Sequence, residues 1–362
     1  MPSSDYVGII MLIDFLNSLI AQVFSVERIE IAMIAMVLSA LLGLLLGPIS
    51  GNANPLLWVL LDKVGGGFSR KIYNVERSLS SLRFRGLVLL GFYICLTLIV
   101  SIFVGSINDH IPFSGFTEPF FLSFVISAGA PWSALIRLHH AIQAESHKGK
   151  SKTGRGSYFD MAVSTRTNLN TTDNHGIIRV GIGFIATHFD KAVVAPLFWY
   201  MIAGLPAAYL YAGIAAARWG VSKDGFSKGV GHIPLEFEKL WGMIPQILSA
   251  IFLSTAAAFT PKAAMSRAVM GVCTSQGTAP YAQGGLPLTV LAWGLGVSLG
   301  GPVEDRDGSV LKRAWVGDKK NTARVETQHL RRAIYLGIIA YILLFATLSG
   351  VLMVREISRL SF

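Results

Sequence analysis

The chain has 362 residues, of which 52% are hydrophobic and only 14% are charged, and its formal net charge is +10. Soluble domains usually carry about 25% charged residues, so this composition excludes an ordinary soluble protein and indicates a membrane protein. A basic chain is also typical of nucleic-acid binding, but here the basic residues lie in segments that flank apolar stretches. Membrane topology and anionic lipid headgroups explain that placement, so we predict contact with membrane lipid and no nucleic-acid partner.

The first part of the chain contains one doubtful and two clear membrane segments. Residues 1–28 include an apolar stretch at 7–24 that carries polar side chains, and we predict an interfacial or peripheral segment there. Residues 29–46 and 86–105 are apolar over the roughly 20 residues that a membrane-spanning helix needs. Cys95 lies in the second of these spans, and we predict that it and Cys273 are buried free thiols rather than a disulfide.

Two candidate spans in the middle of the chain contain proline. Residues 120–136 are predicted to form one span with a kink at Pro131. Residues 192–217 are long enough to cross a membrane, although Gly204 and Pro206 favour a break into two half-helices.

The last candidates are 243–259, which is marginal, 286–301, which is short and rich in glycine, and 333–354, which is a clear span. For 286–301 a re-entrant helix and a full span both remain open. The chain is therefore predicted to be a single all-α, polytopic membrane unit of about five to seven membrane segments, spanning residues 1–362.

Charge asymmetry predicts the orientation of these segments. The stretch 51–85 and the predicted loops 138–191 and 302–332 are basic, whereas the short loop after residue 105 carries two acidic residues and no Lys or Arg. Lys and Arg are enriched in cytoplasmic loops, so the basic stretches are predicted to face the cytoplasm. For a bacterial protein this corresponds to a multi-pass protein of the inner membrane.

Two stretches have a residue order that an apolar composition alone does not explain. The first, VVAPLFWYMIAGLP at 193–206, places an aromatic pair just inside an apolar segment, which by itself is typical of an interfacial anchor. The second, LGGPVEDRDGSVLKRAWVGD at 299–318, begins with a turn-forming Gly-Gly-Pro and continues with charged residues. Glycines and a tryptophan stand at fixed intervals among these charged residues, which favours a structured loop over an irregular, solvated one.

Together these stretches resemble the adenosylcobinamide-phosphate synthase family, CobD/CbiB, of cobalamin biosynthesis. The family's A-P-L-F-W stands at 195–199, its G-V-x-L-G-G-P at 296–302, and its R-P-W-L-G-D reads RAWVGD at 313–318. The resemblance implies ATP-dependent, magnesium-dependent amide formation between a corrinoid acid and an amino-alcohol substrate, aminopropanol or its phosphate.

The resemblance also implies a site on the cytoplasmic side, with the second stretch as one wall. Its carboxylates are expected to be catalytic, and its cations and turn to bind substrate, while no residue is assigned as a metal ligand. The expected catalytic residues are Asp305, Asp307 and Asp318. The expected substrate-binding residues are Arg179, Arg313, Trp315, Gly300, Gly301 and Pro302.

Three family motifs depart from their usual acidic and amide residues here. A Glu, Asn and Asp before A-P-L-F-W become Thr187, His188 and Lys191, and an earlier Glu of the same helix becomes Gly183. The Asp of N-T-L-D becomes Arg218. In S-P-N-x-G-x-P-E, the Asn becomes Gln283 and the Glu becomes Leu288. Neither Lys nor Leu can ligate magnesium, so these changes point to altered or lost synthase chemistry.

Two other functions fit parts of the sequence. AmpE, a membrane protein linked to β-lactamase regulation, resembles the same superfamily without the synthase carboxylates, so a non-catalytic regulator or scaffold with a protein partner is the alternative. Broken helices also suggest a transporter. That interpretation ranks third, because we expect no ionisable residue deep within the clear spans.

Overall fold

The computed structural model describes residues 25–72, 78–110, 114–148, 155–170, 172–221, 229–304 and 310–360. The interfacial segment predicted at 7–24 lies outside these residues. The described helices and strands, in chain order, are α2 (Val26–Leu46), α3 (Leu56–Ile72), α4 (Leu79–His110), α5 (Ser114–Leu122), α6 (Gly129–Lys148), α7 (Arg155–Thr165), α8 (Asn174–Phe189), η2 (Asp190–Val194), α9 (Ala195–Gly220), α10 (His232–Ala258), α11 (Met265–Cys273), η4 (Tyr281–Gln283), α12 (Gly285–Leu295), β1 (Leu299–Gly300), β2 (Val303–Glu304), β3 (Val310–Leu311), β4 (Trp315–Val316) and α13 (Thr327–Leu360).

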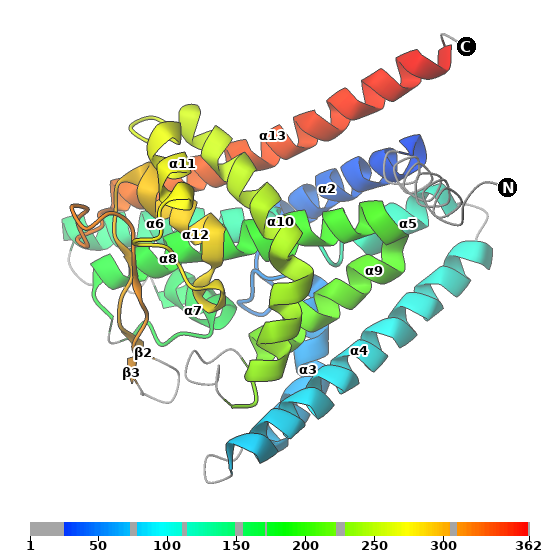
Figure 1. The fold of residues 1–362 in the computed structure, drawn as a ribbon, viewed down its shortest axis with the longest axis horizontal. Helices are drawn as coiled ribbons and strands as arrows, with labels where there is room; N and C mark the ends of the chain where they lie inside the picture. The colour runs from blue at the N-terminus through cyan, green and yellow to red at the C-terminus, as the bar shows by residue number, and fades with distance from the viewer. Residues whose placement is uncertain are drawn as a thin grey trace, which may run out of the picture.

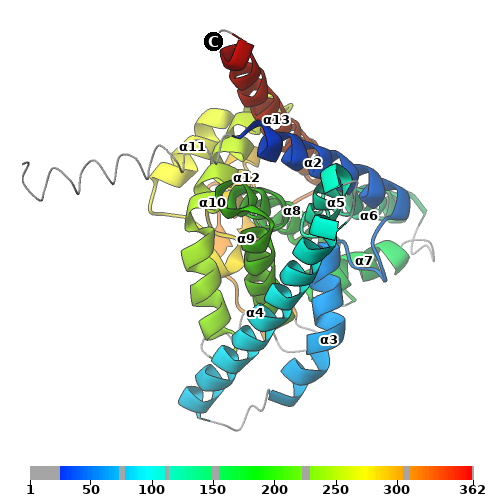
Figure 2. The same cartoon turned by 90° about the vertical axis from the view of Figure 1, so that its right-hand side faces the viewer.

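Helices dominate the described chain, which confirms the predicted all-α, multi-pass fold. By length and composition, five helical stretches can cross a membrane: Val26–Leu46, Leu79–Ile107, Asn174–Gly220, His232–Ala258 and Thr327–Arg359. The longest of them contains α8, η2 and α9, and it is not straight. α8, η2 and the first part of α9 form a rod through the middle of the molecule, and after the kink at Ala203 and Gly204 the rest of α9 turns back (Figure 1). In Figure 2, α9 is flanked by α3, α4 and α10, and it packs against all three. At the other end of the rod, α8 packs against α13 and α6.

The rod changes its helical pitch at η2, a π-helical turn between α8 and α9. A π turn bonds each N–H to a carbonyl five residues back, and it appears mostly as a local bulge that leaves the regular bonding pattern. The carbonyl of Ala192 accepts a hydrogen bond from the Ser127 N–H at 3.0 Å. The Ser127 carbonyl in turn lies 2.7 Å from His188 Nε2. These contacts fasten the connection between α5 and α6 to the centre of the rod.

The predicted break near Gly204 and Pro206 is confirmed. Gly204 has φ 74°, a conformation that glycine adopts easily, and Pro206 follows without an N–H to donate. The broken ladder frees carbonyls inside a membrane span, where unpaired polar groups are costly. Arg28 of α2 donates to two of them, Met201 O at 2.9 Å and Ile202 O at 3.1 Å. A guanidinium therefore stabilises the kink.

Several predicted boundaries were wrong. The span expected at 120–136 is two helices, α5 and α6, separated at residues 123–128. Pro131 lies in the first turn of α6, where proline is tolerated, so it causes no kink. Much of the loop expected at 138–191 is helical, containing the end of α6, all of α7 and α8. For residues 286–301, where a re-entrant helix and a full span were both open, the structure excludes the full span: α12 is short and β1 follows it.

Candidate functional site

A cavity of about 150 Å³ lies where the rod meets α10 and the hairpin formed by β1 to β4. Both α8 and the part of α9 that turns back after the kink contribute side chains to its lining, and α10 contributes Glu238. The segment around Gln283 and the start of α12 form another part of the lining. Residues far apart in the sequence thus line one cavity.

The positions at which the chain departs from the family motifs converge on this cavity. Three separate segments supply them: α8 with η2, the end of α9, and the segment from η4 into α12. All of the following line the cavity: Gly183, Thr187, His188, Lys191, Arg218, Gln283 and Leu288. The substitutions therefore change one site together rather than scattered parts of the fold.

Glu238 and Lys191 form a buried ion pair in the cavity wall. Lys191 Nζ lies 2.8 Å from Glu238 Oε2, and the side chain of Glu238 is only 1% exposed. Lys191 also lies over the ring of Tyr281, 4.8 Å from its centroid. Tyr281 donates its hydroxyl to the Glu238 carbonyl, and burial raises the pKa of this phenol, so it remains protonated. The charge of Lys191 is thus already balanced within the protein.

Arg218 lines the same cavity but has no such counter-charge. It is 8% exposed, and its Nη2 donates to the Ala282 carbonyl at 3.1 Å. Its Nε is buried without a hydrogen-bond partner. No ion pair joins Arg218 to a carboxylate anywhere in the described chain.

In the stretch 299–318, the described residues 299–304 and 310–318 form a hairpin of two short ladders, in which β1 pairs with β4 and β2 with β3. Gly300 has φ 81°, and a Cβ there would lie 2.2 Å from the Ala314 carbonyl oxygen, so only glycine fits. Gly300, Val303 and Arg313 line the cavity. Trp315 lies outside the lining, but its ring stacks under Arg179, which does line it, at 5.4 Å from guanidinium carbon to ring centroid.

The other predicted site residues have different positions. Asp318 is outside the cavity lining, and its Oδ1 accepts the Lys320 N–H at 3.0 Å in a turn. Gly301, with φ 77°, and Pro302 follow the lining residue Gly300 and are themselves outside the lining. Asp305 and Asp307 fall outside the described residues. The structure therefore brings Arg179, Arg313 and Gly300 together at the cavity.

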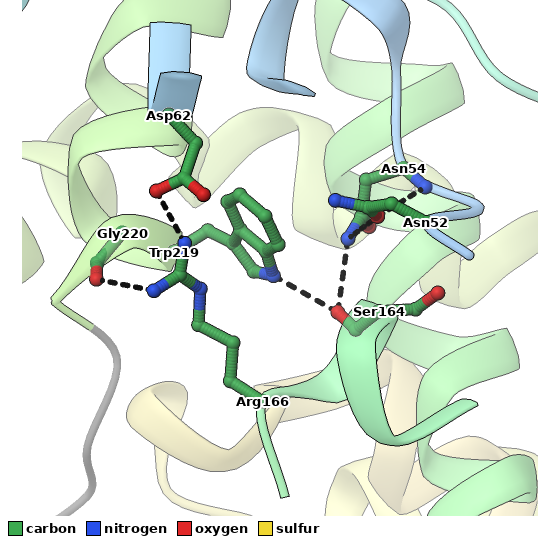
Figure 3. Close-up of polar contacts among 7 residues, drawn as sticks. All are labelled: Asn52, Asn54, Asp62, Ser164, Arg166, Trp219 and Gly220. Atoms are coloured by element: carbon green, nitrogen blue, oxygen red, sulfur yellow. Dashed lines mark hydrogen bonds and ion pairs between the residues drawn. The ribbon is translucent and has the colours of Figure 1, made fainter. Parts of the chain in front are cut away.

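A network of polar side chains builds the wall beside the end of α9 (Figure 3). Arg166 pairs with Asp62 and lies 4.0 Å above the centroid of the Trp219 ring. The Trp219 indole N–H donates to Ser164 O at 2.9 Å, and the Asn54 amide donates to the same oxygen at 2.9 Å. Trp219, Ser164 and Asn54 all line the cavity. The network therefore holds the side chain of Trp219, the residue after Arg218, in place.

The residues described here do not fit a magnesium site. Mg²⁺ is usually held by one or two carboxylates together with waters and phosphate oxygens. Among the described lining residues, Glu238 is the only one with a carboxylate, and that carboxylate already forms an ion pair with Lys191. In the described chain no three His, Cys, Asp or Glu side chains are grouped to hold a metal ion.

Sequence reasoning missed several groups at the site and misplaced others. The expectation that ionisable residues avoid the spans concerned the clear spans 29–46, 86–105 and 333–354, and the buried charges Arg218 and Glu238 lie outside these, in Asn174–Gly220 and His232–Ala258. The available signal for Glu238 was a carboxylate in the lead-in to the marginal span 243–259. Both cysteines are free, as predicted, but they are exposed rather than buried.

Comparison with known proteins gives the family. A family model described as CobD/Cbib protein matches residues 33–337. The Cobalamin biosynthesis protein CobD of Brucella melitensis is 22% identical over 284 residues, which cover 75% of this chain and 83% of that protein. The protein of the same name from Brucella anthropi is 26% identical over 50% of this chain, and that of Rhizobium meliloti is 29% identical over 37%.

The matches to the last two relatives are partial. They span 58% of the Brucella anthropi protein and 41% of the Rhizobium meliloti protein, so this chain covers less than two thirds of either. No solved structure matches the chain. The family model nevertheless covers most of the sequence, including every described residue that lines the cavity. The chain belongs to the CobD/Cbib protein family.

Proposed function

We propose that this protein acts in cobalamin biosynthesis, in the inner membrane of a bacterium, and that the cavity binds an anionic compound of that pathway. The candidates are a corrinoid acid and aminopropanol phosphate. The observation that carries this proposal is the convergence of the seven altered motif positions on one cavity. Relatives named for cobalamin biosynthesis support the choice of pathway.

The reaction implied by the resemblance is ATP-dependent amide formation with magnesium. The described lining replaces the family's acidic and amide residues with Lys191, Arg218, Gln283 and Leu288, and it offers no free carboxylate pair for a metal. We therefore propose binding of the pathway compound as the primary activity of the cavity. A non-catalytic regulator or scaffold is the second candidate, and the same replacements favour it.

Binding and turnover are measured on one detergent-purified sample. A corrinoid acid and aminopropanol phosphate are each titrated by calorimetry, and amide product is followed by mass with ATP and magnesium present. An active family member serves as the turnover control. Saturable binding without product is the expected result. Product would restore the synthase assignment, and no binding of either compound would favour the regulator.

A pair of glycine variants locates the binding. A Cβ on Gly183 would meet only Leu288 Cδ1 at 3.8 Å, so Gly183→Leu extends a side chain into the cavity. Affinity should fall by at least about tenfold, which is about 1.4 kcal/mol. Gly91 lies on α4 with nothing within 4 Å of a Cβ, so Gly91→Leu is the matched control. Equal affinities in the two variants would place the compound elsewhere.

A further inference from the structure

Arg218 carries a buried charge that the described protein leaves uncompensated. Removing a guanidinium from water costs several kcal/mol, and proteins normally offset this with a paired carboxylate. Lys191 has such a partner in Glu238, and Arg166 has one in Asp62. Arg218 has only the Ala282 carbonyl for Nη2, while its Nε is buried and unbonded.

The surroundings of Arg218 indicate which kind of ligand would compensate its charge. A guanidinium presents N–H donors in a planar fork that matches the oxygens of a phosphate or carboxylate. Its bond to Ala282 O holds the fork beside Gln283, whose Oε1 is also buried without a partner. A ligand with an oxyanion and a neighbouring hydrogen-bond donor would satisfy both residues.

We propose that Arg218 anchors an oxyanion, a phosphate or a carboxylate group, that enters the cavity without a metal ion. The inference depends on the proposed function only for which pathway compound carries the group. At the position of a family Asp the chain has a cation, so the sign of charge at this point is reversed. Such a cation contacts the anion directly and needs no bridging magnesium.

The test titrates inorganic phosphate and pyrophosphate into detergent-purified protein, following the fluorescence of the tryptophans, since Trp58 and Trp219 line the cavity. Arg218→Gln should weaken binding by about 30-fold or more, the usual consequence of removing one partner of a buried charge pair. Lys239→Gln removes an equal charge from an exposed position on the same helix as Glu238 and should leave binding unchanged. Adding EDTA should have no effect on the wild type.

Thermal unfolding without ligand adds a second readout. A residue that only supported the fold would lower the melting temperature when replaced. Because Arg218 is buried and unpaired, Arg218→Gln and Arg218→Met should instead melt at a higher temperature than the wild type, and phosphate should no longer stabilise them. Equal phosphate affinity in wild type and Arg218→Gln, a magnesium requirement, or a lowered melting temperature in both variants would overturn the proposal.

The oxyanion can come from a soluble compound or from a lipid headgroup, and phosphorus analysis separates the two. Lipid phosphorus that co-purifies with the wild type and is lost in Arg218→Gln would identify a headgroup. Exchange of soluble phosphate without bound lipid would identify a small compound. If phosphate binds through Arg218 but neither the corrinoid acid nor aminopropanol phosphate binds, the role of Arg218 is supported and the proposed pathway is contradicted.

Discussion

The cavity has two walls that are built differently, one from membrane helices and one from the hairpin 299–318. The helical wall buries Arg218 and Glu238 and leaves Lys191 only 12% exposed, each held within a long apolar element. The hairpin wall contributes Gly300, Val303 and Arg313, while its Trp315 is about half exposed. Charges interact more strongly in the helical wall, where the effective dielectric constant is lower. Burial, rather than the number of charged residues, therefore makes the charges of the helical wall the stronger ones in the cavity.

The largest effect is expected from the ion pair of the helical wall. Glu238→Gln leaves Lys191 as a buried, unpaired cation and should lower the free energy of unfolding by about 3–5 kcal/mol. Replacing both partners, with Lys191→Met and Glu238→Leu, should recover most of this loss. Unfolding in mixed detergent micelles measures it. Glu356→Gln breaks the exposed pair with Arg359 and should cost less than about 1 kcal/mol. Equal losses for the two single variants would erase the contrast between buried and exposed charge.

The hairpin wall should be sensitive to backbone conformation rather than to charge. Gly300→Ala forces a side chain into a left-handed conformation against a carbonyl oxygen and should cost about 1–3 kcal/mol. Gly91→Ala, in the open on α4, should instead be stabilising by about 0.5–1 kcal/mol. The same unfolding assay applies. A neutral Gly300→Ala would mean that the hairpin does not need its present geometry.

Two variants of Asp318 distinguish a chemical role of the hairpin from a structural role. Asp318→Ala removes the acceptor of the Lys320 N–H and should cost about 0.5–1.5 kcal/mol. Asp318→Asn keeps an acceptor oxygen and should remain within about 0.5 kcal/mol of the wild type. Ligand affinity should be unchanged in Asp318→Asn, measured by calorimetry. A loss of binding or turnover there would move the chemistry toward the hairpin and support the catalytic role predicted from sequence.

The smallest effect is expected where the walls meet, at Trp315 and Arg179. Trp315→Leu keeps apolar bulk but removes the cation–π contact, which should cost about 0.5–1 kcal/mol at this half-exposed site. Trp315→Phe retains an aromatic face and should lose less. Thermal unfolding of the two variants side by side measures the difference. A larger loss in Trp315→Phe would show that the ring edge or indole N–H matters instead.

The sequence was sufficient for the fold class because long apolar segments have few alternatives in a membrane. It also located the kink at Gly204, where backbone chemistry is local. It failed at Ser127, because the break between α5 and α6 depends on contacts with η2, more than sixty residues away. The motif comparison found Lys191 and Arg218 as altered positions, but their different pairing depends on Glu238 of another helix. No local pattern carries that information.

The π turn at Asp190–Val194 allows the family motif two registers on this chain, the ungapped one used for Lys191 and one shifted by a residue. Such a turn holds one residue more than an α-helical turn, so it can absorb an insertion without moving the helices on either side. An ungapped alignment gives Lys191 the place of the family's aspartate. A single gap within the turn gives that place to Asp190, whose carboxylate accepts the Ser249 hydroxyl at 2.8 Å. The residue that corresponds to a family motif position then depends on the local helical pitch as well as on the sequence.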